Sequence, residues 1–105
     1  MTTDPTPQVL PRLLALAQRL YGETSGFLDQ ADDPQLWYNR GYANGMLAAI
    51  TELGHAAALT GLLVRDPPDL IQGQEVMPWG QAYRHGWEMG EREAREVLPA
   101  AAVQG

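Results

Sequence analysis

Apolar residues recur every three to four positions along three segments of the chain, which is the spacing of amphipathic helices. In residues 8–29, one face of such a helix collects the side chains of Val9, Leu10, Leu13, Leu14, Leu16, Ala17, Leu20, Tyr21, Phe27 and Leu28. Gly22 and Gly26 weaken the second half of this segment, so the helix can break there. The pattern predicts a first helix over residues 8–29.

An aspartate followed by a proline marks the start of the second helix. Asp33 is a typical N-cap, and Pro34 suits the first helical position, where an amide N–H has no partner to lose. The helix is expected over residues 34–64, with a break near Gly54 or Gly61. Its polar stripe is narrow, which predicts a central element covered on two sides, and consists of Arg40, Asn44, Thr51 and His55. Replacing Arg40 on this stripe by alanine should change the free energy of unfolding by at most about 0.5 kcal/mol.

Prolines mark the rest of the chain. Residues 65–77 contain two consecutive prolines and are expected to be a linker that crosses the surface. Pro78 opens the third helix, which is predicted over residues 78–98, and the ends 1–7 and 100–105 should fray. Together these features predict one all-α domain over 1–105, an antiparallel bundle of three helices.

The most specific feature is an internal repeat. The motif Tyr-x-x-Gly-aromatic-x-x-Gly-x-x-x-Ala-x-x-x-Leu begins at Tyr38 and again at Tyr83, 45 positions later. Glycine inside a helix costs up to about 1 kcal/mol relative to alanine, so close packing of helix backbones is the expected compensation. Approach of a ligand's backbone to the glycines is the functional alternative. The expected packing residues are Tyr38, Gly41, Gly45, Ala49, Tyr83, Gly86, Gly90 and Ala94.

Two helices that carry the same strip of small residues indicate a twofold-related pair, either within the chain or in a dimer. An unbroken helix over 34–64 would be about 46 Å long at 1.5 Å per residue. That length exceeds a globule of this size, whose radius of gyration should be about 13 Å. Either a glycine breaks the helix or a second chain covers it, and a homodimer is the expected assembly.

The composition of the chain indicates the cellular compartment in which it is expected. Hydrophobic residues make up 45% of the 105 residues, and there is no cysteine. Disulfides and thiolate chemistry are therefore excluded, and a reducing cytoplasm is expected. The first residues lack the features of a signal peptide, and no apolar run of about 18 residues predicts a membrane span. All seven positive residues are arginine, which together with abundant alanine and glycine is typical of a GC-rich bacterial genome.

The pairing of Tyr-x-x-Gly-Tyr-x-x-Gly at Tyr38 with Tyr-x-x-Gly-Trp at Tyr83 resembles the glycine- and aromatic-rich helix pair of ribosome modulation factor. The resemblance covers two short stretches of the chain and implies a pair of packed helices that contacts ribosomal RNA. That family is short and basic, whereas this chain adds a helix and has a net charge of −6. A negative surface repels phosphate backbones, so binding to nucleic acid is not expected.

Candidate chemistry is sparse. Glu52 and His55 form the Glu-x-x-His pair of di-iron carboxylate bundles, and Glu93 lies on the corresponding face of the third helix. A hydrogen-bonded Glu/His pair is the favoured interpretation, and no cofactor is expected. There is no phosphate-binding loop and no nucleophile elbow, so an enzyme is not expected either.

The sequence thus favours a non-enzymatic interaction protein with a regulatory or adaptor role, which binds itself and another, unidentified protein. One alternative is a module that binds an apolar or cationic small molecule in a crevice lined by Trp37, Tyr38, Tyr42, Trp79, Tyr83 and Trp87. A metal-binding helical bundle is the remaining alternative.

Overall fold

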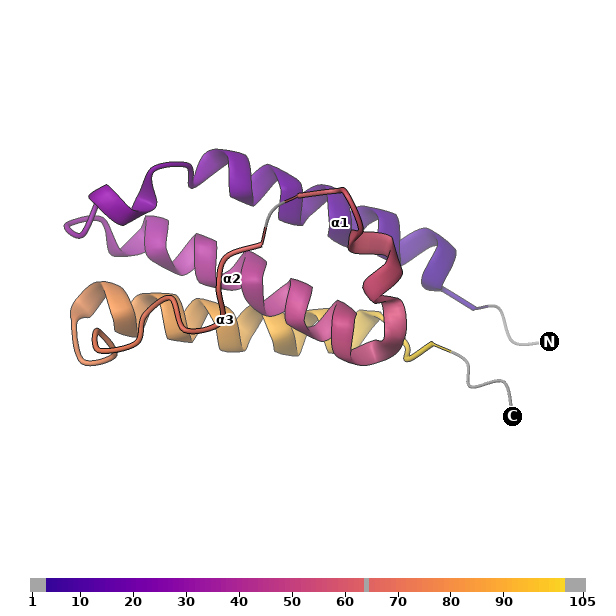
Figure 1. Ribbon diagram of the computed structural model, residues 1–105. Helices are drawn as coiled ribbons and strands as arrows, with labels where there is room; N and C mark the ends of the chain where they lie inside the picture. Colours follow the sequence, from indigo (N-terminus) through magenta and orange to yellow (C-terminus); the bar gives the residue numbers. More distant parts are fainter. Residues whose placement is uncertain (1–3, 64, 102–105) are drawn as a thin grey trace.

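The computed structural model describes residues 4–63 and 65–101. Its three helices are α1 (Thr6–Glu23), α2 (Pro34–Ile50) and α3 (Pro78–Val97), joined by the short helical turns η1 (Phe27–Asp29), η2 (Thr51–His55) and η3 (Ala56–Leu59) (Figure 1). No strand occurs within these two ranges, so the all-α prediction is confirmed. The molecule is elongated, with principal extents of 50 × 23 × 19 Å.

Local signals in the sequence explain where the helices begin. The Asp33 carboxylate accepts a hydrogen bond from the backbone N–H of Leu36 at 3.2 Å, as an N-cap does. Pro34 and Pro78 occupy the first turns of α2 and α3. The first helix starts at Thr6, inside the expected tail 1–7; of that tail, residues 1–3 lie outside the described residues, as do 102–105 of the other end.

The first helix is shorter than the predicted 8–29. It ends at Glu23, and the chain turns through Gly26, whose φ of 80° is in the left-handed region that favours glycine. Phe27 then points into the core, whereas Leu28, expected on the apolar face, is 60% exposed. The turn therefore redirects the last apolar residues of the pattern.

The second helix breaks at Gly54, one of the two expected positions. Its regular α-helical part ends at Ile50, and Gly54 adopts φ 94° inside the following turn. Because the chain bends there, no helix of about 46 Å forms, and the length argument for a second chain no longer applies.

The prediction of an antiparallel bundle is wrong for one of the two helix pairs. The contacts of α1 with α2 run in opposite directions, because Tyr21 bonds to Asn44 while Thr24 bonds to Arg40. Residues further along α2 contact residues further along α3: Gly41 lies against Tyr83, and Gly45 lies against Trp87. These two helices are therefore parallel. The long segment after Gly54 returns the chain along the bundle to the end where α2 began, which makes the parallel arrangement possible (Figure 1).

The glycine strips of α2 and α3 face each other. A Cβ atom at Gly41 would lie 2.0 Å from the carbonyl oxygen of Tyr83, and one at Gly86 would lie 2.0 Å from that of Tyr38. Gly45 and Gly90 repeat the arrangement one turn later against the carbonyls of Trp87 and Tyr42. Each motif therefore packs on the other in the same way, as an internal twofold relation requires.

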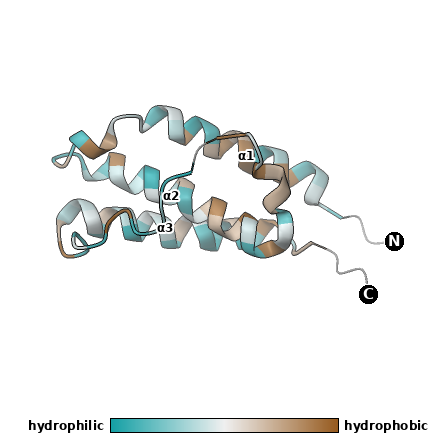
Figure 2. Ribbon diagram, in the orientation of Figure 1, coloured by the Kyte–Doolittle hydropathy of each residue, from teal (hydrophilic) through white to brown (hydrophobic). Residues whose placement is uncertain are grey.

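Apolar packing fills the remaining space around α2. The most deeply buried large side chains include Met46, Leu47, Ile50 and Leu98. Residues of α1 and η3 pack on the second half of α2, where Figure 2 shows the more hydrophobic stretches of the ribbon. The backbone N–H of Ala101 donates to the carbonyl of Leu53 at 2.6 Å, so the expected frayed end is held at this point.

Candidate functional site

A buried ion pair attaches the linker to the helices. The Arg40 guanidinium donates two hydrogen bonds to the Asp66 carboxylate, at 2.6 Å from Nε and 3.0 Å from Nη2. The two side chains are only 12% and 14% exposed. Arg40 also donates to the carbonyl of Tyr21 and to the Thr24 hydroxyl, and its guanidinium lies 3.7 Å from the centre of the Tyr21 ring. One side chain of α2 thus ties together α1 and the linker.

Asn44 extends this contact to α3. Its amide donates to Asp66 at 2.7 Å and to the Tyr83 hydroxyl at 2.9 Å, and its oxygen accepts a hydrogen bond from the Tyr21 hydroxyl. Within the described part of the chain, every buried polar side-chain atom has a hydrogen-bond partner. Such a satisfied network fixes one arrangement of its elements. We call it the Arg40 network: Tyr21, Thr24, Arg40, Asn44, Asp66 and Tyr83.

Burial and hydrogen bonding shift the titration of this network. Burial raises the pKa of the Tyr83 hydroxyl to about 12, although the hydrogen bond from Asn44 opposes the shift. Burial also acts to raise the pKa of Asp66, but the hydrogen bonds from Arg40 and Asn44 outweigh it and lower that pKa below its usual value. Asp66 is therefore ionised and the tyrosine is neutral at physiological pH.

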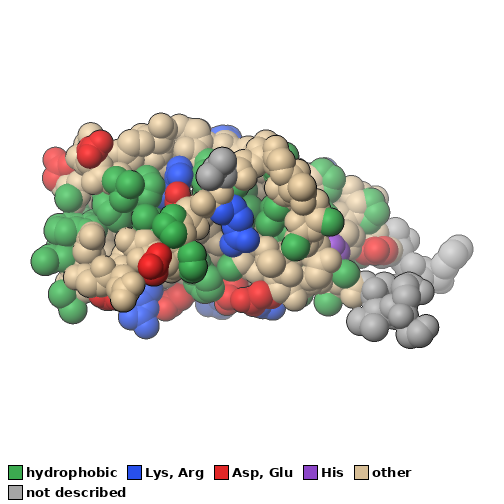
Figure 3. Space-filling view, in the orientation of Figure 1, with side chains coloured by type: hydrophobic (Ala, Val, Ile, Leu, Met, Phe, Trp, Pro, Cys, Tyr) green, Lys and Arg blue, Asp and Glu red, His purple; other side chains and the backbone are tan. Residues whose placement is uncertain are grey.

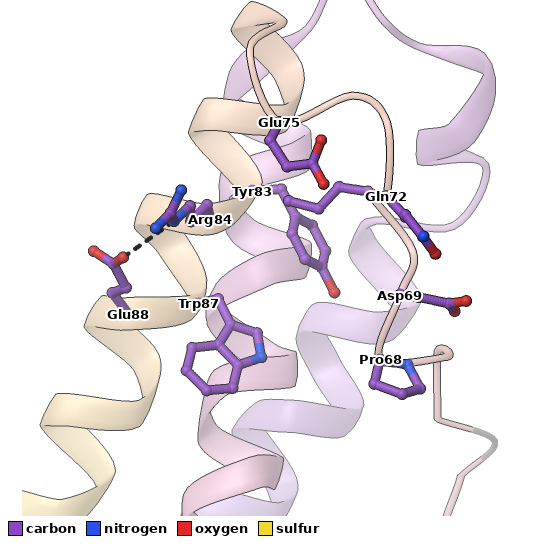
Figure 4. Close-up of a pocket in the computed structure, with 9 residues that line it drawn as sticks. Pro68, Asp69, Gln72, Glu75, Tyr83, Arg84, Trp87 and Glu88 are labelled. Carbon is purple, nitrogen blue, oxygen red and sulfur yellow. Dashed lines mark ion pairs between the residues drawn. The ribbon is translucent and has the colours of Figure 1, made fainter.

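Next to this network, the linker and α3 enclose an open groove. Its first part has a volume of about 480 Å³, and its second part of about 430 Å³. Both parts share Pro68, Tyr83 and Trp87, so they are neighbouring sections of one depression. We call it the linker groove; its other lining residues are Asn44, Ala48, Arg65, Asp66, Pro67, Asp69, Ile71, Gln72, Glu75, Arg84 and Glu88. In Figure 4 the rings of Tyr83 and Trp87 face the linker segment that carries Pro68 and Asp69.

The internal repeat explains why the groove is open. Tyr42 and Trp87 occupy equivalent positions on opposite sides of the α2–α3 pair. The Tyr42 hydroxyl donates a hydrogen bond to Glu93 at 2.7 Å, and the Glu93 side chain fills the space beside the Tyr42 ring. The position equivalent to Glu93 in the first motif is Ala48, whose methyl group leaves the space beside Trp87 unfilled. A difference between the two copies of the motif thus leaves room for the second section of the groove.

The predicted aromatic crevice is divided by the same twofold relation. Trp37, Trp79 and Tyr83 cluster together, with the ring centroids of Trp79 and Tyr83 at 6.4 and 6.5 Å from that of Trp37. Tyr42 lies on the opposite side of the pair, and so does Tyr38, whose ring stacks edge-on against His85 at 5.5 Å. A single crevice with all six rings does not form, because equivalent positions of parallel helices face opposite ways.

The residues considered for a metal site each have another partner. Glu52 pairs with Arg95, the His55 ring nitrogen Nε2 lies 2.9 Å from the carbonyl oxygen of Pro99, and Glu93 accepts from Tyr42. Among the residues that the structure describes, no group of three or more histidine or acidic side chains could hold a metal ion.

Sequence reasoning missed the central residue of the site. Arg40 and Asn44 were placed on the narrow polar stripe, and Arg40 was expected to contribute little to stability; in the structure the linker covers both side chains, and that of Arg40 is only 12% exposed. A signal was present in Asp66, which directly precedes the two prolines in the segment expected to cross the surface. Gly80 was also missed: a Cβ atom there would lie 1.9 Å from the carbonyl oxygen of Gln74, so this glycine lets the linker end pack on α3.

Comparisons with protein-family models, with curated proteins and with solved structures give no match for this chain. No helix in the described ranges is both long and apolar enough to cross a membrane.

Proposed function

We propose that this chain is a non-enzymatic interaction protein with a regulatory or adaptor role, and that it binds a segment of another protein in the linker groove. The half-buried Trp87 carries this proposal. Tryptophan is enriched among the residues that dominate binding at protein interfaces. Here it faces an open depression with one rigid wall, because the Arg40 network and Pro67-Pro68 hold the linker. A preformed groove lowers the entropy cost of binding.

The residues of the groove support binding rather than catalysis. The described lining residues include no histidine, the commonest general base, and no serine or threonine hydroxyl; their carboxylates and the Tyr83 hydroxyl have no nucleophile to activate there. Figure 3 shows hydrophobic side chains gathered on this face toward the end where α2 and α3 begin, interspersed with acidic ones. An apolar surface rimmed by polar groups is typical of a protein-binding site.

Affinity capture from the native cell tests the proposal. Bait protein with Trp87→Ala should recover less than about one tenth of the partner that the unchanged chain recovers, the effect of losing about 1.4 kcal/mol. Val97→Ala is the matched control, because Val97 is 49% exposed and does not line the groove. Equal recovery with folded Trp87→Ala would refute the groove as the binding site.

We further propose that the chain forms a homodimer through the end at which α2 and α3 begin. Leu28, Val76 and Met77 are 60%, 78% and 42% exposed and belong to turns at that end (Figure 1). Burying such residues against a second copy would remove apolar surface from water. Light scattering should give about twice 11.5 kDa at micromolar concentration, and 11.5 kDa throughout a dilution series would exclude the dimer.

A second candidate function is binding of a small molecule in the same groove. Its larger section, about 480 Å³, falls within the range of ligand pockets, which is roughly 300–1,000 Å³. Thermal-shift screening separates the two functions, because only this one predicts stabilisation by free small molecules.

A further inference from the structure

The larger section of the linker groove carries an excess of negative charge. Asp69, Glu75 and Glu88 line it, and Arg84 is its one positive residue. The Arg84 guanidinium lies 3.5 Å from the Glu88 carboxylate, and both side chains are largely exposed. Arg84 therefore neutralises one of the three carboxylates, while Asp69 and Glu75 have no ion-pair partner among the described residues.

The same section has an aromatic side chain whose interactions are incomplete. The indole N–H groups of Trp37 and Trp79 donate to Gln30 and Gln74, whereas no described residue accepts a hydrogen bond from that of Trp87. No other described aromatic ring or guanidinium stacks on the Trp87 ring. Tryptophan offers the strongest aromatic attraction for a cation placed over its face.

Elsewhere in the molecule, the chain itself shows which group fits such surroundings. Arg40 lies with its guanidinium over Tyr21 and Phe27 while its edge donates two hydrogen bonds to Asp66. Arginine does this better than lysine, because its planar guanidinium can stack on a ring and bind a carboxylate through two N–H groups at once. The groove is lined by the same two kinds of group, an indole and carboxylates without an ion-pair partner, but no arginine of the described chain lies between them.

From this combination we infer that the linker groove recognises an arginine side chain in an extended basic segment of the partner protein. The guanidinium lies against the Trp87 ring, and the carboxylates of Asp69 and Glu75 on the linker side of the groove supply the negative potential that attracts it. Apolar neighbours of the arginine pack on Ile71 and Pro68. This inference rests on the proposed function, since it names the partner chemistry of the same groove. The excess negative charge of the chain as a whole, −6, also attracts a basic segment and increases its rate of association.

Selection of peptides from a random library displayed on phage, with the full chain as the target, tests the inference. The enriched peptides should share an arginine flanked by apolar residues. A synthetic peptide of the enriched sequence should bind about tenfold more weakly when its arginine is replaced by citrulline, which has nearly the same shape but no charge. Replacement by lysine should weaken binding less. Raising the salt concentration should weaken binding of the arginine peptide and leave binding of the citrulline peptide nearly unchanged.

Variants of the chain localise the effect, and all of them are at exposed positions where folding is not at risk. Glu75→Gln should weaken binding of the arginine peptide about two- to fivefold. Arg84→Gln, which removes the ion-pair partner of Glu88, should strengthen that binding by a similar factor. Glu23→Gln and Arg19→Gln are matched controls, because these residues form an equivalent exposed ion pair on α1, at 3.0 Å. They should change the affinity by less than twofold.

Two results would overturn the inference while leaving the proposed function intact: enriched peptides without arginine that still need Trp87, or equal affinity of the citrulline peptide. If the enriched peptides bind folded Trp87→Ala as tightly as the unchanged chain, or if no peptide is enriched, both the inference and the proposed function fail.

Discussion

A Cβ atom at Gly45 would lie 1.9 Å from the carbonyl oxygen of Trp87. No side chain fits at this distance, and the obstacle is backbone that belongs to a helix. The absence of a side chain at Gly45 therefore sets the separation of α2 and α3. Since Trp87 also faces the linker groove, the same contact positions the residue on which the proposed function depends.

Gly45→Ala should lower the free energy of unfolding by about 1–3 kcal/mol or more, because α3 must move away to admit the methyl group. Gly90→Ala should behave alike, since its Cβ would lie 2.0 Å from the carbonyl oxygen of Tyr42. Gly22→Ala is the matched control. Gly22 is helical and a Cβ atom there would meet nothing within 4 Å. The change should therefore raise the free energy of unfolding by about 0.4–1 kcal/mol. Chemical denaturation measures all three, and stabilisation by Gly45→Ala would contradict the account of the helix pair.

Arg40→Ala should destabilise the chain by about 2–4 kcal/mol, since it leaves the largely buried Asp66 carboxylate without its main partner. This replaces the expectation from the sequence of at most about 0.5 kcal/mol. Asp66→Ala should cost a similar amount, and the double variant should cost less than the sum of the two, because one interaction is lost in both. Arg19→Ala, in an exposed pair, should stay within about 0.5 kcal/mol. Strict additivity of Arg40→Ala and Asp66→Ala would show that the ion pair contributes nothing.

The position of Tyr83 predicts a loss of stability at high pH. Its pKa is raised from 10.0 to about 12 in the folded chain, so the folded state holds a proton that the unfolded state has released between these values. The resulting stability is complete below pH 10 and is lost as the pH rises through 12, by up to about 2–3 kcal/mol. Tyr83→Phe should reduce this alkaline decline, measured by denaturation at a series of pH values. An unchanged slope in the variant would show that Tyr83 does not titrate with folding.

Local signals in the sequence predicted much of the fold. Asp33, Pro34 and Pro78 marked the starts of α2 and α3, and Gly54 was one of two expected breaks. The repeat identified the glycines that lie between α2 and α3. These features depend on neighbours in the chain, or on steric rules that hold wherever two helices meet.

The parallel direction of α2 and α3 and the burial of Arg40 depend on where the linker runs, which no periodic pattern records. A polar stripe looks the same in a sequence whether water or a carboxylate from a distant segment covers it. One section of the groove depends on the difference between Ala48 and Glu93 at equivalent positions of the two motifs. This difference can be interpreted only once the helices are known to be parallel.

Site-specific photocrosslinking in the native cell tests most directly whether the partner binds in the linker groove. A photoreactive benzoylphenylalanine replaces Gln72, an exposed residue of the groove, and in a separate variant Arg12, an exposed residue of α1 that does not line it. The account predicts a discrete crosslinked product from position 72 that disappears when Trp87→Ala is added, and no such product from position 12. A crosslink to the same partner from position 12 but not from position 72 would contradict it.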